Sequence, residues 1–189
     1  EIRLSLVGSE MCIRDSICVY ALFDNEEVGS ATNQGAGATF LKNTLTRISH
    51  SLGYSYDETQ AMIARSFMIS ADNGHALHPN HGEYADPVNA PRLNEGIVIK
   101  FNAQQRYATD GFSAAFFRDL CRRVEVPTQT FTNRSDIPGG STLGNISNTK
   151  VSMPTVDIGL PQLAMHSSYE TAGTKDTAYL VQACTAFFE

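Results

Sequence analysis

Residues 17–30, ICVYALFDNEEVGS, place two adjacent carboxylates, Glu26 and Glu27, directly after an apolar run. Residues 17–23 have the length and the apolar character of a buried β-strand. An ionised carboxylate at the end of such a strand is costly unless a cation or several hydrogen-bond donors replace its lost hydration. A bound metal would replace it, with one glutamate as a ligand and the other holding a water. A solvated acidic turn is the alternative that this motif alone leaves open.

Predicted strands and helices alternate outward from this stretch. Further strands are expected at residues 67–71, 97–102, 128–133 and 155–159. Helices are expected at residues 34–50, after Asp57 as an N-cap, from Asp110 to Val124, and from Thr174 or Lys175 onward. Strands that are almost continuously apolar, with helices between them, predict an α/β fold with a mixed, mainly parallel sheet flanked by helices.

Composition excludes several classes of protein. The chain has 189 residues, of which 42% are hydrophobic and 18% charged, and its net charge is -6. These values fit one folded domain and give no basic surface for nucleic acid. No apolar run approaches the length of a membrane span. The cysteines, Cys12, Cys18, Cys121 and Cys184, are scattered, so we expect reduced thiols and a cytoplasmic protein.

Residues 1–16, EIRLSLVGSEMCIRDS, read unlike the remainder of the chain. They show neither a helix period nor a strand period, and they lack the apolar segment of a secretory signal. We expect a foreign leader joined to an authentic sequence that begins near Ile17. An ordinary irregular N-terminus is the alternative.

Asp72 ends a predicted strand and precedes a loop, residues 73–95, that carries three of the five histidines, His75, His78 and His81. Aspartate and histidine both bind zinc and related metals. The spacing of the histidines and the nearby Pro79 disfavour a three-histidine site on one helix. We therefore expect one or two of them to line a pocket beside Asp72. A loop held together by side-chain hydrogen bonds is the alternative.

Two further segments could contribute to a site. His166 follows an apolar run, so we expect its ring to be partly buried, either as a core residue or, together with Asp72 and the acidic motif, as a metal ligand. The Gly-rich residues 139–142 could offer backbone N–H groups to a carbonyl, carboxylate or phosphate. They could also simply begin a helix capped by Ser141. No nucleotide-binding GxxxxGK[ST] pattern is present.

Five separated motifs now coincide with one family. FDNEEVGS, SADNGHALHPNH, IVIKFNAQQRYATD, IPGGSTLG and LAMHSSYE closely resemble, in the same order, successive motifs of the aspartyl aminopeptidase family of zinc exopeptidases. The resemblance covers residues 17–189, which we interpret as the C-terminal part of a metallopeptidase catalytic domain. It implies a zinc-exopeptidase-like fold and two divalent metal ions, zinc in the family, which activate a water to attack the first peptide bond.

The resemblance also implies the catalytic and metal-binding residues. Glu26 matches the general base, and Tyr107 resembles the residue that stabilises the tetrahedral oxyanion. Glu27, Asp72 and His166 match metal ligands.

Other matching positions imply a substrate-binding pocket. Lys100 resembles the residue that pairs with an acidic substrate side chain, which would favour peptides with a free N-terminal Asp or Glu. His75 and His78 resemble pocket histidines. Gly140 and Thr142 lie in the Gly-rich motif and are expected to contact the substrate.

The chain departs from the family in what it lacks. Family members take one metal-binding histidine, a bridging aspartate and an inserted dimerisation domain from segments upstream of the NEE motif. We therefore expect the full-length parent to be an active homo-oligomeric aminopeptidase, and this chain alone to be inactive. A di-metal hydrolase of broader specificity is one alternative. A non-catalytic assembly module is another, although a scaffold has no reason to retain Glu26.

Overall fold

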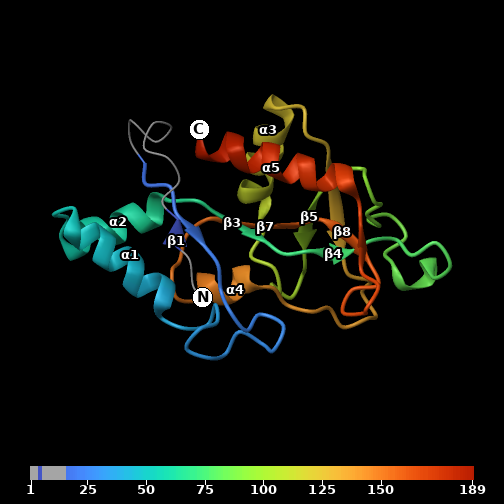
Figure 1. Ribbon diagram of the computed structural model, residues 1–189, viewed down its shortest axis with the longest axis horizontal. Coiled ribbons are helices and arrows are strands. Elements are labelled where there is room, and N and C mark those ends of the chain that lie inside the picture. Colours follow the sequence, from blue (N-terminus) through green and yellow to red (C-terminus); the bar gives the residue numbers. More distant parts are fainter. Residues whose placement is uncertain (1–3, 6–15) are drawn as a thin grey trace. The chain divides into compact units, whose positions relative to one another are not determined.

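The structure is a computed structural model that describes residues 4–5 and 16–189 (Figure 1). It divides into two compact units. The first comprises the described residues up to Met68 together with residues 143–154 and 188–189, and the second comprises residues 69–142 and 155–187. The predicted leader, residues 1–16, lies almost entirely outside the described residues and stays a prediction.

The second unit is organised around a sheet of strand order β3-β7-β5-β6. Its strands are β3 (Met68–Ala71), β5 (Ile97–Phe101), β6 (Thr128–Thr132) and β7 (Thr155–Gly159). β5 runs parallel to β6 and antiparallel to β7. Every residue of β7 and the first four of β5 are buried, as expected of strands covered on both faces. Helices α3 (Gly111–Arg123) and α5 (Thr174–Phe188) lie on one side of the sheet (Figure 1), which confirms the predicted α/β class.

A smaller sheet continues from the first at the end of β3. It contains β4 (Gly74–His75), β8 (Pro161–Leu163) and β9 (Thr171–Ala172), with β4 parallel to β8 and β8 antiparallel to β9. Asp72 N–H donates to the Ile158 carbonyl over 3.0 Å, and Gly74 N–H donates to the Leu160 carbonyl over 3.0 Å. The pairing therefore steps past Asn73, where the chain passes from one sheet to the other.

Gly159 makes this step possible because a Cβ at that position would overlap the Asp72 carbonyl oxygen. The loop predicted at residues 73–95 thus begins with a strand, and it also contains a 3-10 helix, η1 (Gly82–Tyr84).

Side-chain caps fix the starts of two helices. Asp110 caps α3, as predicted: its carboxylate accepts from Ser113 N–H, and the Ser113 hydroxyl oxygen accepts from Asp110 N–H. The N-cap of α2 (Tyr56–Arg65) is Ser55, so the prediction of Asp57 was wrong by two residues. Ser55 and Glu58 satisfy each other's backbone N–H groups in a capping box, which Asp57 cannot do from inside the first turn.

Helix α1 (Phe40–Ser51) begins six residues later than the predicted residue 34. Gly37 N–H donates to the Ser30 carbonyl over 3.0 Å, and a Cβ at Gly35 would overlap the same peptide group. Because Gly35 and Gly37 both pack against the Ser30 peptide group, residues 34–39 form turns. Ala36 lies at helical spacing from the apolar residues of α1 but is not part of the helix. The short helix α4 (Leu143–Asn148) follows the Gly-rich loop.

The strand predicted at residues 17–23 is largely wrong. Only β2 (Tyr20–Ala21) forms, paired with β1 (Leu4–Ser5). Ile17, Tyr20 and Leu22 are 40%, 48% and 44% exposed. A two-residue ladder cannot exclude water from both faces of an apolar segment, so the premise of a buried strand end before Glu26 fails.

The cysteines are not uniformly reduced. Cys121 and Cys184 are free, and burial raises the pKa of both thiols, that of Cys121 to about 12. Cys18 is disulfide-bonded, so the prediction of a reduced thiol was wrong for this residue. None of the helices in the described part of the chain is long and apolar enough to cross a membrane.

Candidate functional site

The ends of β3 and β5 bring Asp72 and Lys100 together. Lys100 is 1% exposed. Its ammonium donates to the Asn73 carbonyl over 2.8 Å and lies 3.4 Å from Asp72 Oδ2. A buried cation requires such partners because it has lost its hydration. Lys100 therefore contacts two groups of its own chain, the Asp72 carboxylate and the Asn73 carbonyl. Its predicted contact with an acidic substrate stays a prediction.

Tyr107 lies in the core beside Lys100. Its ring meets Phe131 edge-on at 6.3 Å between centroids, and the Lys100 ammonium lies 5.5 Å from the ring centroid. Burial, followed by the charges of Asp157 and Asp72, raises the pKa of Tyr107 to about 12. The phenol is thus kept protonated and can act as a hydrogen-bond donor.

A buried carboxylate that the sequence did not reveal connects two candidate segments. Asp157, on β7, is 1% exposed and accepts from the Thr142 hydroxyl over 2.9 Å and from Ala108 N–H over 2.5 Å. It thereby joins the end of the Gly-rich loop to the segment that carries Tyr107. The hydroxyl of Thr142 is committed to this contact. The one sequence feature that could have indicated this buried carboxylate is the aspartate inside the otherwise mostly apolar strand TVDIG.

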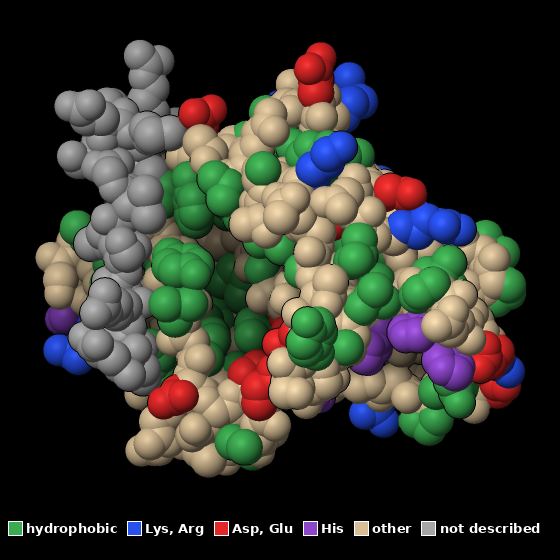
Figure 2. Space-filling view, turned by 45° about the vertical axis from the view of Figure 1, so that its right-hand side comes forward, with side chains coloured by type: hydrophobic (Ala, Val, Ile, Leu, Met, Phe, Trp, Pro, Cys, Tyr) green, Lys and Arg blue, Asp and Glu red, His purple; other side chains and the backbone are tan. Residues whose placement is uncertain are grey.

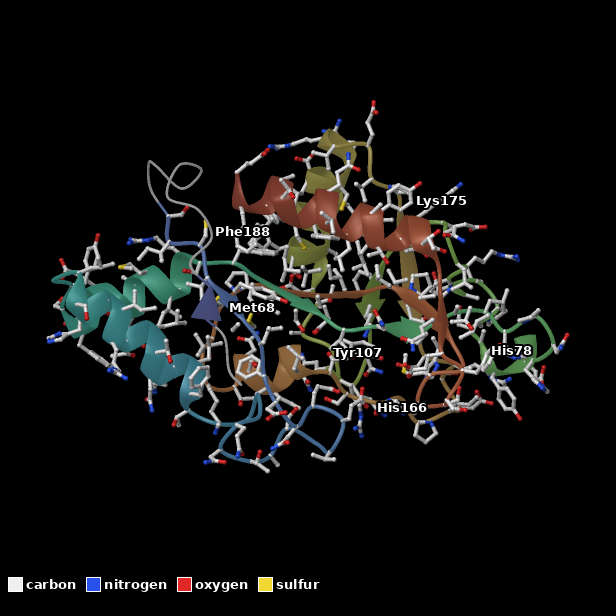
Figure 3. All side chains as sticks on the ribbon, viewed as in Figure 1. Met68, His78, Tyr107, His166, Lys175 and Phe188 are labelled. Atoms are coloured by element: carbon white, nitrogen blue, oxygen red, sulfur yellow. The ribbon has the colours of Figure 1, made fainter. Side chains whose placement is uncertain are left out.

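His75 and His166 approach this cluster from the smaller sheet. Burial, and then the positive charges of His166 and Lys100, lower the pKa of His75. His166 lies in the loop between β8 and β9 and is exposed, so the prediction that its ring is partly buried was wrong. Its φ of 66° is left-handed, as is that of Ala164 at 54°. Non-glycine residues held in that region often mark functional loops. Figure 3 shows Tyr107 and His166 on the side of the sheet away from α5.

The other predicted pocket residues line a cavity of about 400 Å³ within the same unit. His75, His78 and Gly140 contribute to its wall, together with His81 and Tyr84. The rings of His78 and His81 lie 5.0 Å apart. Histidine side chains accordingly gather on one face, beside acidic ones (Figure 2). We predicted that one or two of the three histidines would line a pocket beside Asp72. All three line this cavity, Asp72 is not among its lining residues, and a role of the histidines in substrate binding stays a prediction.

Glu26 and Glu27 belong to the first unit. They lie in the turns after β2, where Glu26 is half-buried and Glu27 exposed. Asn25 and Ser30, which flank them, have left-handed φ values of 60° and 56°. The roles of Glu26 as general base and of Glu27 as metal ligand stay predictions.

The described residues do not form a complete zinc site. No three His, Cys, Asp or Glu side chains among residues 4–5 and 16–189 converge to hold a metal ion. A protein zinc site takes three protein ligands or more. Asp72 and His166 offer suitable donor atoms but do not suffice, and the three histidines of residues 75–81 form no such group either.

Comparison with known proteins identifies the family. The model of the family Peptidase_M18, described as Aminopeptidase I zinc metalloprotease (M18), matches residues 4–188, and the chain belongs to this family. The predicted resemblance to the zinc exopeptidases is thereby confirmed.

The chain is similar to relatives of greater length. It is 49% identical over 170 residues to the "Probable M18 family aminopeptidase 2" of Clostridium acetobutylicum, covering 90% of this chain and 39% of the relative. A chain in the cryo-EM structure of the Ape4 and Nbr1 complex is 41% identical with a TM-score of 0.87, covering 90% of this chain and 32% of that one. The mApe1 dodecamer of S. cerevisiae is 30% identical with a TM-score of 0.81, covering 93% and 39%. The chain thus spans about two fifths of the length of the curated relatives it matches.

Proposed function

We propose that this chain is part of a metalloaminopeptidase that releases N-terminal residues, preferentially Asp or Glu, from peptides. The observation that carries the proposal is the cluster of Asp72, His75, Lys100 and Tyr107 at the strand ends of one unit, in a member of the M18 family. Relatives named as aminopeptidases support it.

The side chains of this chain would divide the chemistry between them. Glu26 would accept the proton of the attacking water and pass it to the leaving amine. Tyr107, kept protonated by its surroundings, would donate a hydrogen bond to the oxygen of the scissile carbonyl as negative charge develops there.

The family description names zinc, and two zinc ions held in part by Glu27, Asp72 and His166 belong to the proposal. Because the described residues lack a group of three ligands, we expect this chain alone to bind metal weakly and to be inactive, whereas the whole protein is active.

Preference for acidic substrates is the finer part of the proposal. It rests on Lys100, whose ammonium would attract a substrate carboxylate. The ion pair with Asp72 competes for that charge, which favours the alternative of a broader-specificity di-metal hydrolase. A panel of aminoacyl amides separates the two, because only the first predicts faster release of Asp and Glu than of Ala and Leu.

Assembly and location complete the proposal. A solved relative is a dodecamer, which supports a homo-oligomeric whole protein. We also propose a cytoplasmic location. A non-catalytic assembly module would share the fold and the oligomeric state but would lack turnover.

The deciding experiment measures zinc content after dialysis and hydrolysis of an aspartyl amide on the same sample. The matched control is Glu26→Gln, which should keep any bound metal and lose turnover. Little zinc and no turnover in this chain, with both present in the whole protein, is the expected result. A whole protein that binds zinc but releases no N-terminal residue would refute the function and favour the assembly module.

A further inference from the structure

We propose that Asp157 is a positioning residue that holds residues 107–109, which include Tyr107, in a fixed relation to the Gly-rich loop. The Thr142 hydroxyl then serves Asp157 and not the substrate. Asp157 is 1% exposed, so it acts through these two segments. The catalytic part of the inference rests on the function proposed above, whereas the junction of the two segments at Asp157 can be tested without activity.

The first contact lies where the pairing of β5 with β7 ends. The two strands pair up to Ile99 and Ile158. At the next residue of β7, Asp157, a side chain takes the place of a strand partner. The Thr109 hydroxyl oxygen accepts from Asp157 N–H over 2.8 Å, and the hydroxyl donates to the Asp157 carbonyl over 3.4 Å. Thr109 thereby satisfies both backbone groups of a buried residue, as such groups require.

The Asp157 carboxylate adds a second point of attachment for the same segment. Its Oδ2 accepts from Ala108 N–H over 2.5 Å. This N–H belongs to the peptide group that follows Tyr107, so the bond fixes the backbone that carries the Tyr107 ring. The ring packs edge-on against Phe131, and its centroid lies 5.5 Å from the Lys100 ammonium. Tyr107 is therefore held both by its backbone and by its ring.

The other carboxylate oxygen holds the Gly-rich loop. Asp157 Oδ1 accepts from the Thr142 hydroxyl over 2.9 Å, and Thr142 is 4% exposed. A hydroxyl has one proton, and this proton is used on the carboxylate. A substrate carbonyl could take it only from a buried carboxylate that has lost its hydration, which is costly. The Thr142 hydroxyl therefore positions the loop.

Both attached segments contribute to one cavity. Thr109 lines a cavity of about 630 Å³ at the ends of β5 and β6, and so does Gly139 of the Gly-rich loop. Because each segment is bonded to Asp157, this residue sets how far apart the two parts of the wall lie. A site whose parts are fixed before the substrate arrives need not reorganise during the reaction. Asp157 would supply that preorganisation.

The first test measures amide hydrogen exchange of the full chain by NMR. Thr142→Val keeps the shape of the side chain and removes its hydroxyl, which frees one side of the Asp157 carboxylate. The Ala108 amide, bonded to the other side, should then exchange on the order of 10-fold faster. The amide of Ile99, a fully buried residue of β5, should change less. Thr142→Ser restores the hydroxyl and should restore the slow exchange of Ala108.

Thr130→Val is the matched control for lost hydroxyl groups. The Thr130 hydroxyl accepts from Arg118 at an exposed position of the same unit, over 3.0 Å. Its removal should leave the exchange of the Ala108 amide unchanged. An Ala108 amide that ignores Thr142→Val, or that gains no more than the Ile99 amide, overturns the junction.

Asp157→Asn tests the bond to Ala108 directly. An amide side chain has one acceptor oxygen, which must face Ala108 N–H, and its NH₂ group then faces Thr142. A neutral oxygen accepts more weakly than a carboxylate, so the NMR signal of the Ala108 amide proton should move upfield. An unmoved signal would contradict this contact.

A double-mutant cycle tests whether the two segments act through the same residue. Thr109→Val and Thr142→Val each remove one hydroxyl that is bonded to Asp157. Once one of them has loosened Asp157, the other has less to remove. The double variant should therefore lower the urea midpoint by less than the sum of the two single shifts. Shifts that simply add would show independent hydroxyls and overturn the proposal.

Activity of the whole protein adds an independent arm. A loss of position without a loss of substrate contact predicts that Thr142→Val lowers kcat for an aspartyl amide on the order of 10-fold, with little change in KM. Thr142→Ser should recover most of that loss. A raised KM with unchanged kcat would mean that the Thr142 hydroxyl binds the substrate, and it would overturn the catalytic part. A parent protein without turnover bears on the proposed function alone, because the exchange result decides the junction.

Discussion

Replacing Asp176 should destabilise the second unit more than its position in the first turn of a helix suggests. The side chain is 0% exposed. Its carboxylate accepts from Asn94 N–H over 2.6 Å and from Gly96 N–H over 3.0 Å. Asn94 in turn accepts Lys175 N–H on its own side chain over 3.0 Å. The start of α5 and the turn that leads into β5 thus hold each other through residues 80 or more apart.

The magnitude follows from the groups left behind. Asp176→Ala removes both bonds and leaves two backbone N–H groups without their acceptor, at about 1–3 kcal/mol each. Loss of a negative charge from the N-terminal turn of α5 adds about 0.3–1 kcal/mol. Allowing for partial relaxation, we expect the free energy of unfolding to fall by about 3–5 kcal/mol. Asp176→Asn should cost less, because one oxygen remains.

Urea denaturation followed by circular dichroism measures this loss, and amide hydrogen exchange at Asn94 and Gly96 locates it. Asp119→Ala is the matched control, because Asp119 is a partly exposed helical acid paired with Arg122 and Arg123, and should cost less than about 1 kcal/mol. A loss below about 1 kcal/mol for Asp176→Ala, with unchanged exchange at both amides, would refute the reasoning.

Three further outcomes are expected. Gly159→Ala would place a methyl group against the Asp72 carbonyl. It should lower the midpoint of urea denaturation and shift the NMR signal of the Asp72 amide. An unshifted signal would count against the close approach of the two backbones. The hydrogen bond from Ser113 N–H lowers the pKa of Asp110 below its ordinary 3.8. The cap therefore stabilises α3 above pH 3.8, and its contribution is lost as the pH falls through the lowered pKa. Asp110→Asn should not show this loss in an acid titration followed by circular dichroism. Lys100→Met leaves the Asn73 carbonyl without its ammonium donor and the partly exposed Asp72 carboxylate without its ion pair, and should cost about 1–3 kcal/mol in urea denaturation. A gain in stability would instead indicate that Lys100 is held at a structural cost for use on substrate.

The central fold could be predicted because its signals are local. β5 and β7 are mostly apolar, each with one charged residue, Lys100 and Asp157, and α3 begins at an aspartate whose own side chain caps it. The apolar run of residues 17–23 gives the same local signal, yet only β2 forms there. An apolar sequence indicates that a segment prefers burial. It does not indicate whether neighbouring strands are available to bury that segment.

The candidate site could be predicted only where motifs mark it. Asp72 and His75 stand in such motifs, and the structure brings both close to Lys100. Asp157 and Asp176 do not, and their partners lie 49 and 82 residues away in the chain. Hydrogen bonds between such distant segments depend on the finished topology, so no spacing rule could have found them.

The step at Asn73 has a consequence for how the chain can pair while it folds. Parallel strands with smooth apolar faces can slide past each other by two residues and keep every side chain on its proper face. Here a slide would bring Asp157 or Pro161 opposite the Asp72 carbonyl in place of Gly159, and a Cβ has no room there. Gly159 therefore disfavours pairings that are shifted by two residues, because each of them would place a Cβ against the Asp72 carbonyl.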